Sequence, residues 1–194
     1  MADSNLTLTQ ETAAAGRGVM ALLMGDRGAA RHFDFSQRGL ITSFLALVAV
    51  AGFESVARAV LGLTASGEIT RSTISTGLVY ASLIGASALM LRQINRMDAL
   101  RPYVVTLNWA NALFAVVALL AYTVGLSFLV FAIAIAGFVV LINIGRFVMT
   151  LKPLQIAMLV VAQLVGFCVA LLLIALLFPL TPEQLEAIAA AAAA

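Results

Sequence analysis

The stretch Leu40–Leu63, a run of 24 mostly apolar residues, restricts the possible folds of this chain more than any other feature of the sequence. At about 1.5 Å per residue a helix of this length crosses a bilayer core of about 30 Å. The stretch holds Glu54, the only acidic residue inside any long apolar run, and Arg58 four residues later. Residues four apart share a helix face, so these side chains are expected to meet. The pair is interpreted as a structural clasp or, alternatively, as part of a transport or proton path.

Four further apolar runs make this an all-α, polytopic membrane bundle. The chain has 194 residues, of which 63% are hydrophobic and 10% charged, against roughly 25% charge in soluble domains. A soluble chain of this length could not bury so much apolar surface. The domain of five transmembrane helices is predicted over 36–180, with spans at about 38–63, 72–95, 102–124, 127–149 and 153–179.

Polar segments flank this domain at both ends. Residues 1–35 are predicted to form a cytoplasmic segment. Within it, residues 19–33 are predicted to lie on the membrane surface as an amphipathic interfacial helix. The alternative is an irregular segment, because Gly25 and Gly28 interrupt the helical pattern. Residues 181–194 are predicted to form a short Ala-rich helix, because Thr181, Pro182 and Gln184 make a capping signature.

The basic residues predict the orientation in the membrane. Alternate connecting segments hold nine of the eleven Lys and Arg residues, and the other segments hold Arg58 and Arg71 only. The positive-inside rule then places the N-terminus in the cytoplasm and the C-terminus on the exoplasmic side. Ten arginines against one lysine, with many alanines, suggest a GC-rich bacterial genome. The localisation predicted from this is the bacterial inner (cytoplasmic) membrane.

Two sets of residues inside the spans are candidates for a role. The first is an intramembrane polar cluster, whose members need partners because unsatisfied polar groups are costly in hydrocarbon: Glu54, Arg58, Asn108, Asn111, Asn143 and Gln163. The second is a helix-packing stripe of small residues spaced by four, which lets another helix approach closely: Thr73, Gly77, Ala81 and Gly85. We expect this stripe to pack inside the monomer or, alternatively, to form a dimer seam.

Catalytic and cofactor patterns are missing from the sequence. It contains no GxSxG, HExxH, paired acids or CxxC, and no histidine inside a span for haem or quinone. Cys168 is the single cysteine, and His32 beside Asp34 is interpreted as an interfacial structural pair. No enzymatic activity, cofactor or metal is therefore expected. Nucleic-acid binding is rejected because the basic residues lie at helix ends rather than in one patch.

Two phrases, HFDFSQRGLITSF (32–44) and VVTLNWANAL (104–113), are similar to segments of uncharacterised bacterial inner-membrane proteins. Five spans with a cytoplasmic N-terminal segment and a short exoplasmic tail also resemble the Yip1-like membrane proteins. This resemblance implies a helical membrane bundle that works through partners rather than by catalysis, and it assigns no functional residue.

The function expected from these observations is that of a non-enzymatic scaffold or accessory subunit of a membrane assembly. Its partners would be the lipid bilayer and other membrane subunits or a second copy of the chain. The alternative is a small transporter or channel subunit that uses five polar residues within the spans: Glu54, Arg58, Asn108, Asn111 and Asn143. Against transport, the spans show no inverted repeat and no Gly/Pro-broken helix.

Overall fold

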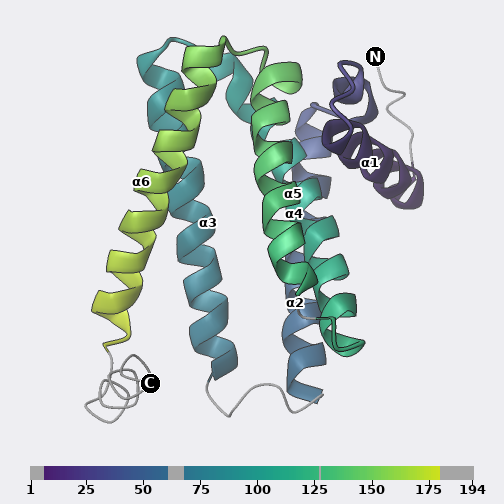
Figure 1. Ribbon diagram of the computed structural model, residues 1–194, viewed down its shortest axis with the longest axis vertical. Helices are drawn as coiled ribbons and strands as arrows, with labels where there is room; N and C mark the ends of the chain where they lie inside the picture. Colours follow the sequence, from purple (N-terminus) through teal and green to yellow (C-terminus); the bar gives the residue numbers. More distant parts are fainter. Residues whose placement is uncertain (1–6, 61–67, 127, 180–194) are drawn as a thin grey trace.

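The computed structural model describes residues 7–60, 68–126 and 128–179, and their regular structure is helical throughout (Figure 1). Five stretches are long and apolar enough to cross a membrane: Gln37–Val60, Glu68–Gln93, Met97–Thr123, Leu129–Val148 and Pro153–Leu177. These confirm the predicted bundle of five spanning helices. The helices are α2 (Gln37–Val60), α3 (Glu68–Gln93), α4 (Leu100–Thr123), α5 (Leu129–Asn143) and α6 (Pro153–Leu177), with α1 (Leu8–Leu23) preceding them.

Local sequence signals explain several helix ends. Thr7 caps α1 by accepting a hydrogen bond from the Gln10 amide, and the Gln10 side chain accepts one in return from the Thr7 amide at 3.0 Å. At the start of α2 the Ser36 hydroxyl accepts from the Gly39 amide at 3.2 Å. Pro153 occupies the first position of α6, where its missing N–H leaves no helical bond unmade.

Several helix boundaries differ from the predicted ones. The second span was predicted over 72–95, whereas α3 begins at Glu68 and ends at Gln93. A 3₁₀ turn, η2 (Met97–Ala99), precedes α4, and a single π-helical turn, η3 (Ile144–Val148), follows α5. The predicted helix over 181–194 lies outside the described residues.

The N-terminal helix is displaced from its predicted position. The prediction of one amphipathic helix over 19–33 was wrong, because α1 ends at Leu23 and Gly25 takes a left-handed conformation with φ +72°. The chain then turns into a short 3₁₀ segment, η1 (Ala29–His32). Gly25 favours this ending because it has no Cβ to oppose a positive φ.

The spans form two groups that meet at one end of the molecule. The helix α2 packs chiefly against α4, with α5 beside α4, whereas α3 packs chiefly against α6. In Figure 1 the α3–α6 pair and the α2–α4–α5 group come together at the top of the view, the level at which α1 lies, and spread apart toward the bottom. The helix α1 contacts α4 and α5.

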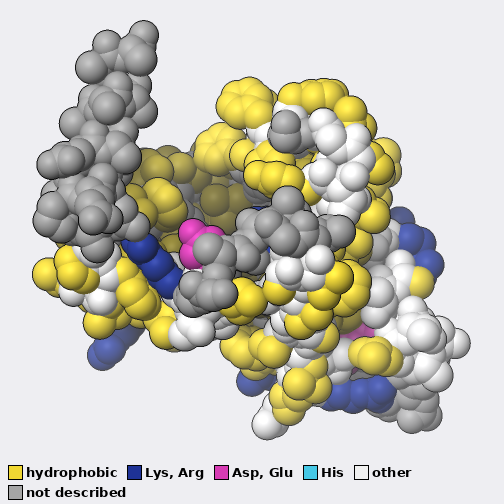
Figure 2. All heavy atoms as spheres, turned by 90° about the horizontal axis from the view of Figure 1, so that it is seen from below, with side chains coloured by type: hydrophobic (Ala, Val, Ile, Leu, Met, Phe, Trp, Pro, Cys, Tyr) yellow, Lys and Arg dark blue, Asp and Glu magenta, His cyan; other side chains and the backbone are white. Residues whose placement is uncertain are grey.

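The most deeply buried side chains belong to residues at the α1 end of the bundle. Leu22, Leu91, Tyr103 and Ile144 are fully buried there. Large apolar side chains elsewhere along the spans face outward, as a lipid-facing surface requires. Figure 2, viewed from the end opposite α1, shows a mainly apolar surface with a hollow between apolar side chains.

Candidate functional site

Asn108 lies at the centre of a hydrogen-bonded cluster that joins three spans. Its side chain is fully buried in α4. The Tyr80 hydroxyl of α3 donates to Asn108 Oδ1, and Asn108 Nδ2 donates to the Ser43 hydroxyl of α2 at 3.1 Å. Ser43 donates in turn to the Leu40 carbonyl at 2.8 Å. Every polar atom of this cluster therefore has a partner inside the bundle, as buried polar groups require.

A second polar cluster joins α6 to α3 and α4. Gln163 Nε2 of α6 donates to the Leu83 carbonyl of α3 at 3.1 Å and to the Ser87 hydroxyl. Ser87 is fully buried, and its hydroxyl lies 3.4 Å from that of Tyr103 of α4. Because α3 supplies both Tyr80 and Ser87, seven residues apart on one helix face, it holds both clusters.

Glu54 and Arg58 form the predicted contact. Glu54 Oε1 lies 2.7 Å from Arg58 Nη2 and accepts a second hydrogen bond from Arg58 Nε at 3.0 Å. The guanidinium also lies 5.3 Å from the centre of the Tyr122 ring, near the end of α4, which is within cation–π range. The Glu54 side chain is 25% exposed and the Arg58 side chain is 38% exposed. The pair therefore neutralises its own charge and joins α2 to α4.

The other predicted members of the polar cluster lie apart from these groups. Asn143 donates to the Leu22 carbonyl of α1 at 2.7 Å, so it fixes α1 to the bundle. Asn111 is half-buried and makes no hydrogen bond to another described residue. The six residues thus do not form one cluster, because their spacing along the spans puts them at different depths and on different helix pairs.

The small-residue stripe is not buried against the described part of the chain. Thr73, Gly77, Ala81 and Gly85 are all exposed on α3. A Cβ atom added at Gly77 or Gly85 would meet nothing within 4 Å. The expectation that this stripe packs inside the monomer was therefore wrong, because α3 uses a different face against α6.

Gly166 of α6 provides the close approach that the stripe was expected to make. A Cβ atom added there would lie 2.8 Å from the Ser82 carbonyl oxygen and 3.0 Å from Ala86 Cβ. The glycine therefore lets the backbones of α3 and α6 come together, which is the usual role of small residues between membrane helices. The sequence carried a signal for it, because Ala162 and Ala170 lie four residues before and after Gly166, but this second set of small residues was not selected.

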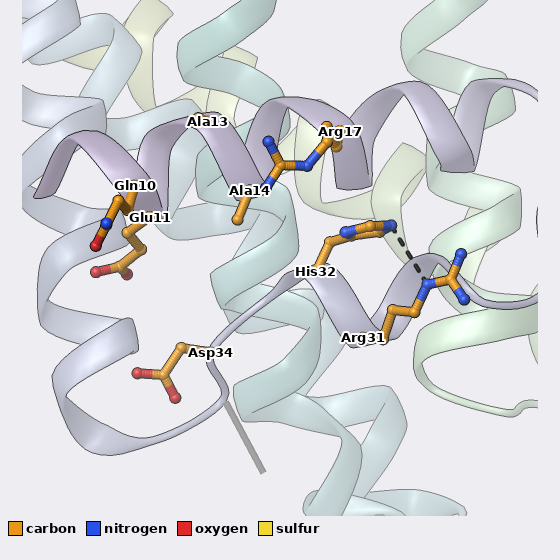
Figure 3. Close-up of a pocket in the computed structure, with 8 residues that line it drawn as sticks. All are labelled: Gln10, Glu11, Ala13, Ala14, Arg17, Arg31, His32 and Asp34. Carbon is orange, nitrogen blue, oxygen red and sulfur yellow. Dashed lines mark hydrogen bonds between the residues drawn. The ribbon is translucent and has the colours of Figure 1, made fainter. Parts of the chain in front are cut away.

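A pocket of about 370 Å³ lies outside the spans, between α1 and the segment that contains η1 and Asp34 (Figure 3). Its lining includes Glu11 and Arg17 of α1, Arg31 and His32 of η1, and Asp34. Glu11 was not among the residues predicted from the sequence to have a role. The signal for it was its position on the α1 face that also carries the buried Ala15, Gly18 and Leu22.

Glu11 is only 5% exposed, and its Oε1 atom has no hydrogen-bond partner among the described residues. Burial raises the pKa of the Glu11 carboxyl, and the nearby Asp34 carboxylate adds to the rise. Arg38 and the Thr42 hydroxyl of α2 oppose it. The predicted pair of His32 and Asp34 is not joined by a hydrogen bond. Instead, His32 Nε2 accepts a hydrogen bond from Arg31 Nε at 3.5 Å.

The described helices define an integral membrane protein of the helical-bundle class. Comparison with protein-family models, with curated proteins and with solved structures finds no match. The resemblance to Yip1-like proteins therefore stays a prediction. Among the described residues no group of three His, Cys, Asp or Glu side chains is placed to hold a metal ion.

Proposed function

We propose that the protein is a non-enzymatic scaffold or accessory subunit of a membrane assembly. One observation carries this proposal: all but Asn111 of the predicted polar residues inside the spans bond to other groups of the bundle. Asn108 and Gln163 bond to neighbouring helices, and Glu54 bonds to Arg58. A transport path needs polar groups that exchange partners with a passing solute, whereas these groups already have fixed partners.

The exposed stripe on α3 supports a partner of a particular kind. Four small side chains in a row leave a shallow surface on which another transmembrane helix packs closely. The partner is then a membrane helix of another subunit or of a second copy. The concentration of basic residues at the α1 end supports a cytoplasmic location for that end, and the composition supports a bacterial inner membrane.

Site-specific photo-crosslinking in native membranes tests this proposal. A photoreactive residue at Gly77 or Gly85 is expected to capture a membrane protein in stoichiometric amount after gentle detergent extraction. The control position is Val165 of α6, which is 55% exposed and is expected to capture lipid only. A chain that purifies as a monomer and gives no protein adduct from either stripe position would contradict the proposal.

The alternative, a transporter or channel subunit, is favoured by the partial exposure of the Glu54–Arg58 pair within a span. Proteoliposomes loaded with a pH-sensitive dye separate the two functions. A scaffold is expected to give no proton flux above that of empty liposomes. Proton flux that disappears in a correctly folded Glu54→Gln variant would instead establish transport.

A further inference from the structure

The helix α1 is held against the spans by one face. Ala15, Val19 and Leu22 on this face are buried, and α1 contacts α4 and α5. Asn143 Nδ2 of α5 donates a hydrogen bond to the Leu22 carbonyl at 2.7 Å. Other apolar side chains of α1 have no such cover, since Leu8 is 62% exposed and Met20 is 55% exposed.

The hydrogen bond from Asn143 indicates the depth of α1 in the bilayer. The span Leu129–Val148 has 20 residues, and its length of about 30 Å matches the hydrocarbon core. Asn143 lies five residues before the end of this span, which is about 7–8 Å inside the core. Figure 1 shows α1 running across the spans rather than along them. The exposed side chains of α1 therefore lie where head groups meet acyl chains, the depth at which amphipathic surface helices bind.

The two sides of α1 differ in polarity. Gln10 and Arg17 line the pocket that faces η1 and Asp34 (Figure 3). Because Asp34 precedes the first span, this side of α1 faces the aqueous surface. At 3.6 residues per turn, Leu8 lies opposite Arg17, and Met20 lies between them and away from the buried face. The side away from the pocket is thus apolar, and the long Arg17 side chain can reach the head groups from its edge.

The exposed part of this segment is positively charged. Arg17 and Arg27 are exposed, and neither forms an ion pair with another described residue. Glu11, the acidic residue of α1, is buried, and Asp26 already contacts Arg31 at 3.7 Å. Unpaired cations beside exposed apolar side chains suit an anionic phospholipid, which offers a negative head group and acyl chains together.

We propose that α1 is an in-plane membrane helix that binds anionic phospholipids in the leaflet at its end of the bundle. Leu8 and Met20 contact the acyl chains, and Arg17 reaches the phosphate groups. The interfacial role predicted from the sequence for residues 19–33 then belongs to α1. Lipid binding by α1 does not depend on a partner at the stripe on α3, so the two can be tested separately.

Spin labels on the full chain test the position of α1 in vesicles of phosphatidylcholine and phosphatidylglycerol. Cys168 is first replaced by Ser, and a label is attached at Leu8→Cys or Met20→Cys. Both labels are expected to be relaxed more by oxygen, which concentrates in lipid, than by a water-soluble nickel chelate. Gln10→Cys is the matched control, because Gln10 is near Leu8 in the sequence but lines the pocket. The nickel chelate is expected to dominate there.

Two results would overturn the in-plane position. Stronger relaxation by nickel than by oxygen at Leu8 and Met20 would mean that this side of α1 lies in water. Shielding of both labels from both reagents would mean that protein, from a second copy of the chain, covers this side instead of lipid.

The lipid preference is measured at the same place. A fluorophore at Met20→Cys is exposed to phosphatidylglycerol or phosphatidylcholine with brominated acyl chains, and quenching by the two lipids is compared. Phosphatidylglycerol is expected to quench more. Arg17→Gln is expected to lower this preference by about fivefold, the contribution of one basic side chain at a charged membrane surface.

Arg92→Gln is the matched control for the charge, because it removes an exposed arginine near the end of α3. It is expected to leave the preference at Met20 unchanged. Arg17 is exposed, so its replacement leaves the buried face of α1 intact. Equal quenching by the two lipids in the otherwise unchanged chain would overturn the proposed binding of anionic phospholipids.

Discussion

Tyr80 of α3 donates a hydrogen bond to the side-chain carbonyl of Asn108, the fully buried amide of α4. The same amide donates to Ser43 of α2, so one side chain connects three spans. The α3–α6 pair and the α2–α4 pair otherwise pack mostly within themselves. Asn108 is thus one of the few groups that hold the two halves of the bundle together.

Replacing Asn108 by Leu is expected to destabilise the bundle by about 1–3 kcal/mol, because it leaves the Tyr80 and Ser43 hydroxyls without this partner. Thermal unfolding in detergent measures the change. Asn111→Leu is the matched control, since Asn111 is half-buried and bonds to no other described residue. Equal stability of the Asn108 and Asn111 variants would mean that the cluster contributes nothing to the bundle.

Gly166→Ala is expected to cost about 1–3 kcal/mol through overpacking, because the added methyl group collides with the Ser82 carbonyl oxygen. Gly77→Ala on the exposed face of α3 is expected to be neutral or to stabilise the helix by up to about 1 kcal/mol. Both variants are compared by thermal unfolding of the monomer in detergent. A larger loss for Gly77→Ala would indicate that its face is covered after all.

Glu54→Gln is expected to destabilise the protein by less than about 1 kcal/mol, because the amide oxygen still accepts from Arg58. Arg58→Ala removes the partner of the carboxylate and the contact with Tyr122, and is expected to cost about 1–3 kcal/mol. The exchange Glu54→Arg with Arg58→Glu restores part of this loss if the two side chains act as a clasp. Unfolding of the three variants in one detergent gives the comparison, and no recovery in the exchanged variant would rule out a clasp.

The raised pKa of Glu11 gives stability a defined pH dependence. A folded-state pKa above the ordinary value of 4.5 means that the folded protein binds the proton more tightly than the unfolded chain does. This contribution is fully present below pH 4.5 and is lost as pH rises through the folded-state pKa. Glu11→Gln is expected to flatten this part of the profile in thermal unfolding with lipid removed, whereas Asp98→Asn leaves it in place. A wild-type profile that rises over this interval would contradict the assignment.

Orientation is testable with single cysteines after Cys168, which is exposed in α6, has been replaced by Ser. Met97 and Val124 lie at opposite ends of the third span and are both exposed. An impermeant thiol reagent applied to intact cells is expected to label Val124→Cys and to leave Met97→Cys unlabelled until the cells are lysed. The reverse result would invert the proposed orientation.

The spans could be predicted from the sequence because each depends on a property of its own residues. A run of about 20 apolar residues forms a helix in a bilayer whatever its neighbours are, since every backbone group must be bonded internally. The Glu54–Arg58 contact was predictable for the same reason, because both residues belong to one helix.

Contacts between helices could not be predicted in this way. The partners of Asn108 are separated from it by 65 and 28 residues, and nothing in the spacing pairs α3 with α6 rather than with α4. Gly77 and Gly166 show the difficulty, because each belongs to a row of small residues spaced by four. The row with Gly77 faces outward, whereas Gly166 lies in the contact with α3. Glu11 was missed because its burial depends on how α1 docks, which helix periodicity alone does not determine.

The pairing of α3 with α6 also sets an order of events during synthesis. The ribosome delivers α3 well before α6, the last helix in the described part of the chain, and growing chains fold from the N-terminal side. Until α6 enters the bilayer, Gly166 is not yet packed against Ser82 of α3. The Ser87 hydroxyl likewise lacks the hydrogen bond that the Gln163 amide later donates. A nascent chain that stops before Pro153 therefore exposes a polar, unmatched helix face to the insertion and quality-control machinery of the membrane, and completion of α6 is the step that removes it.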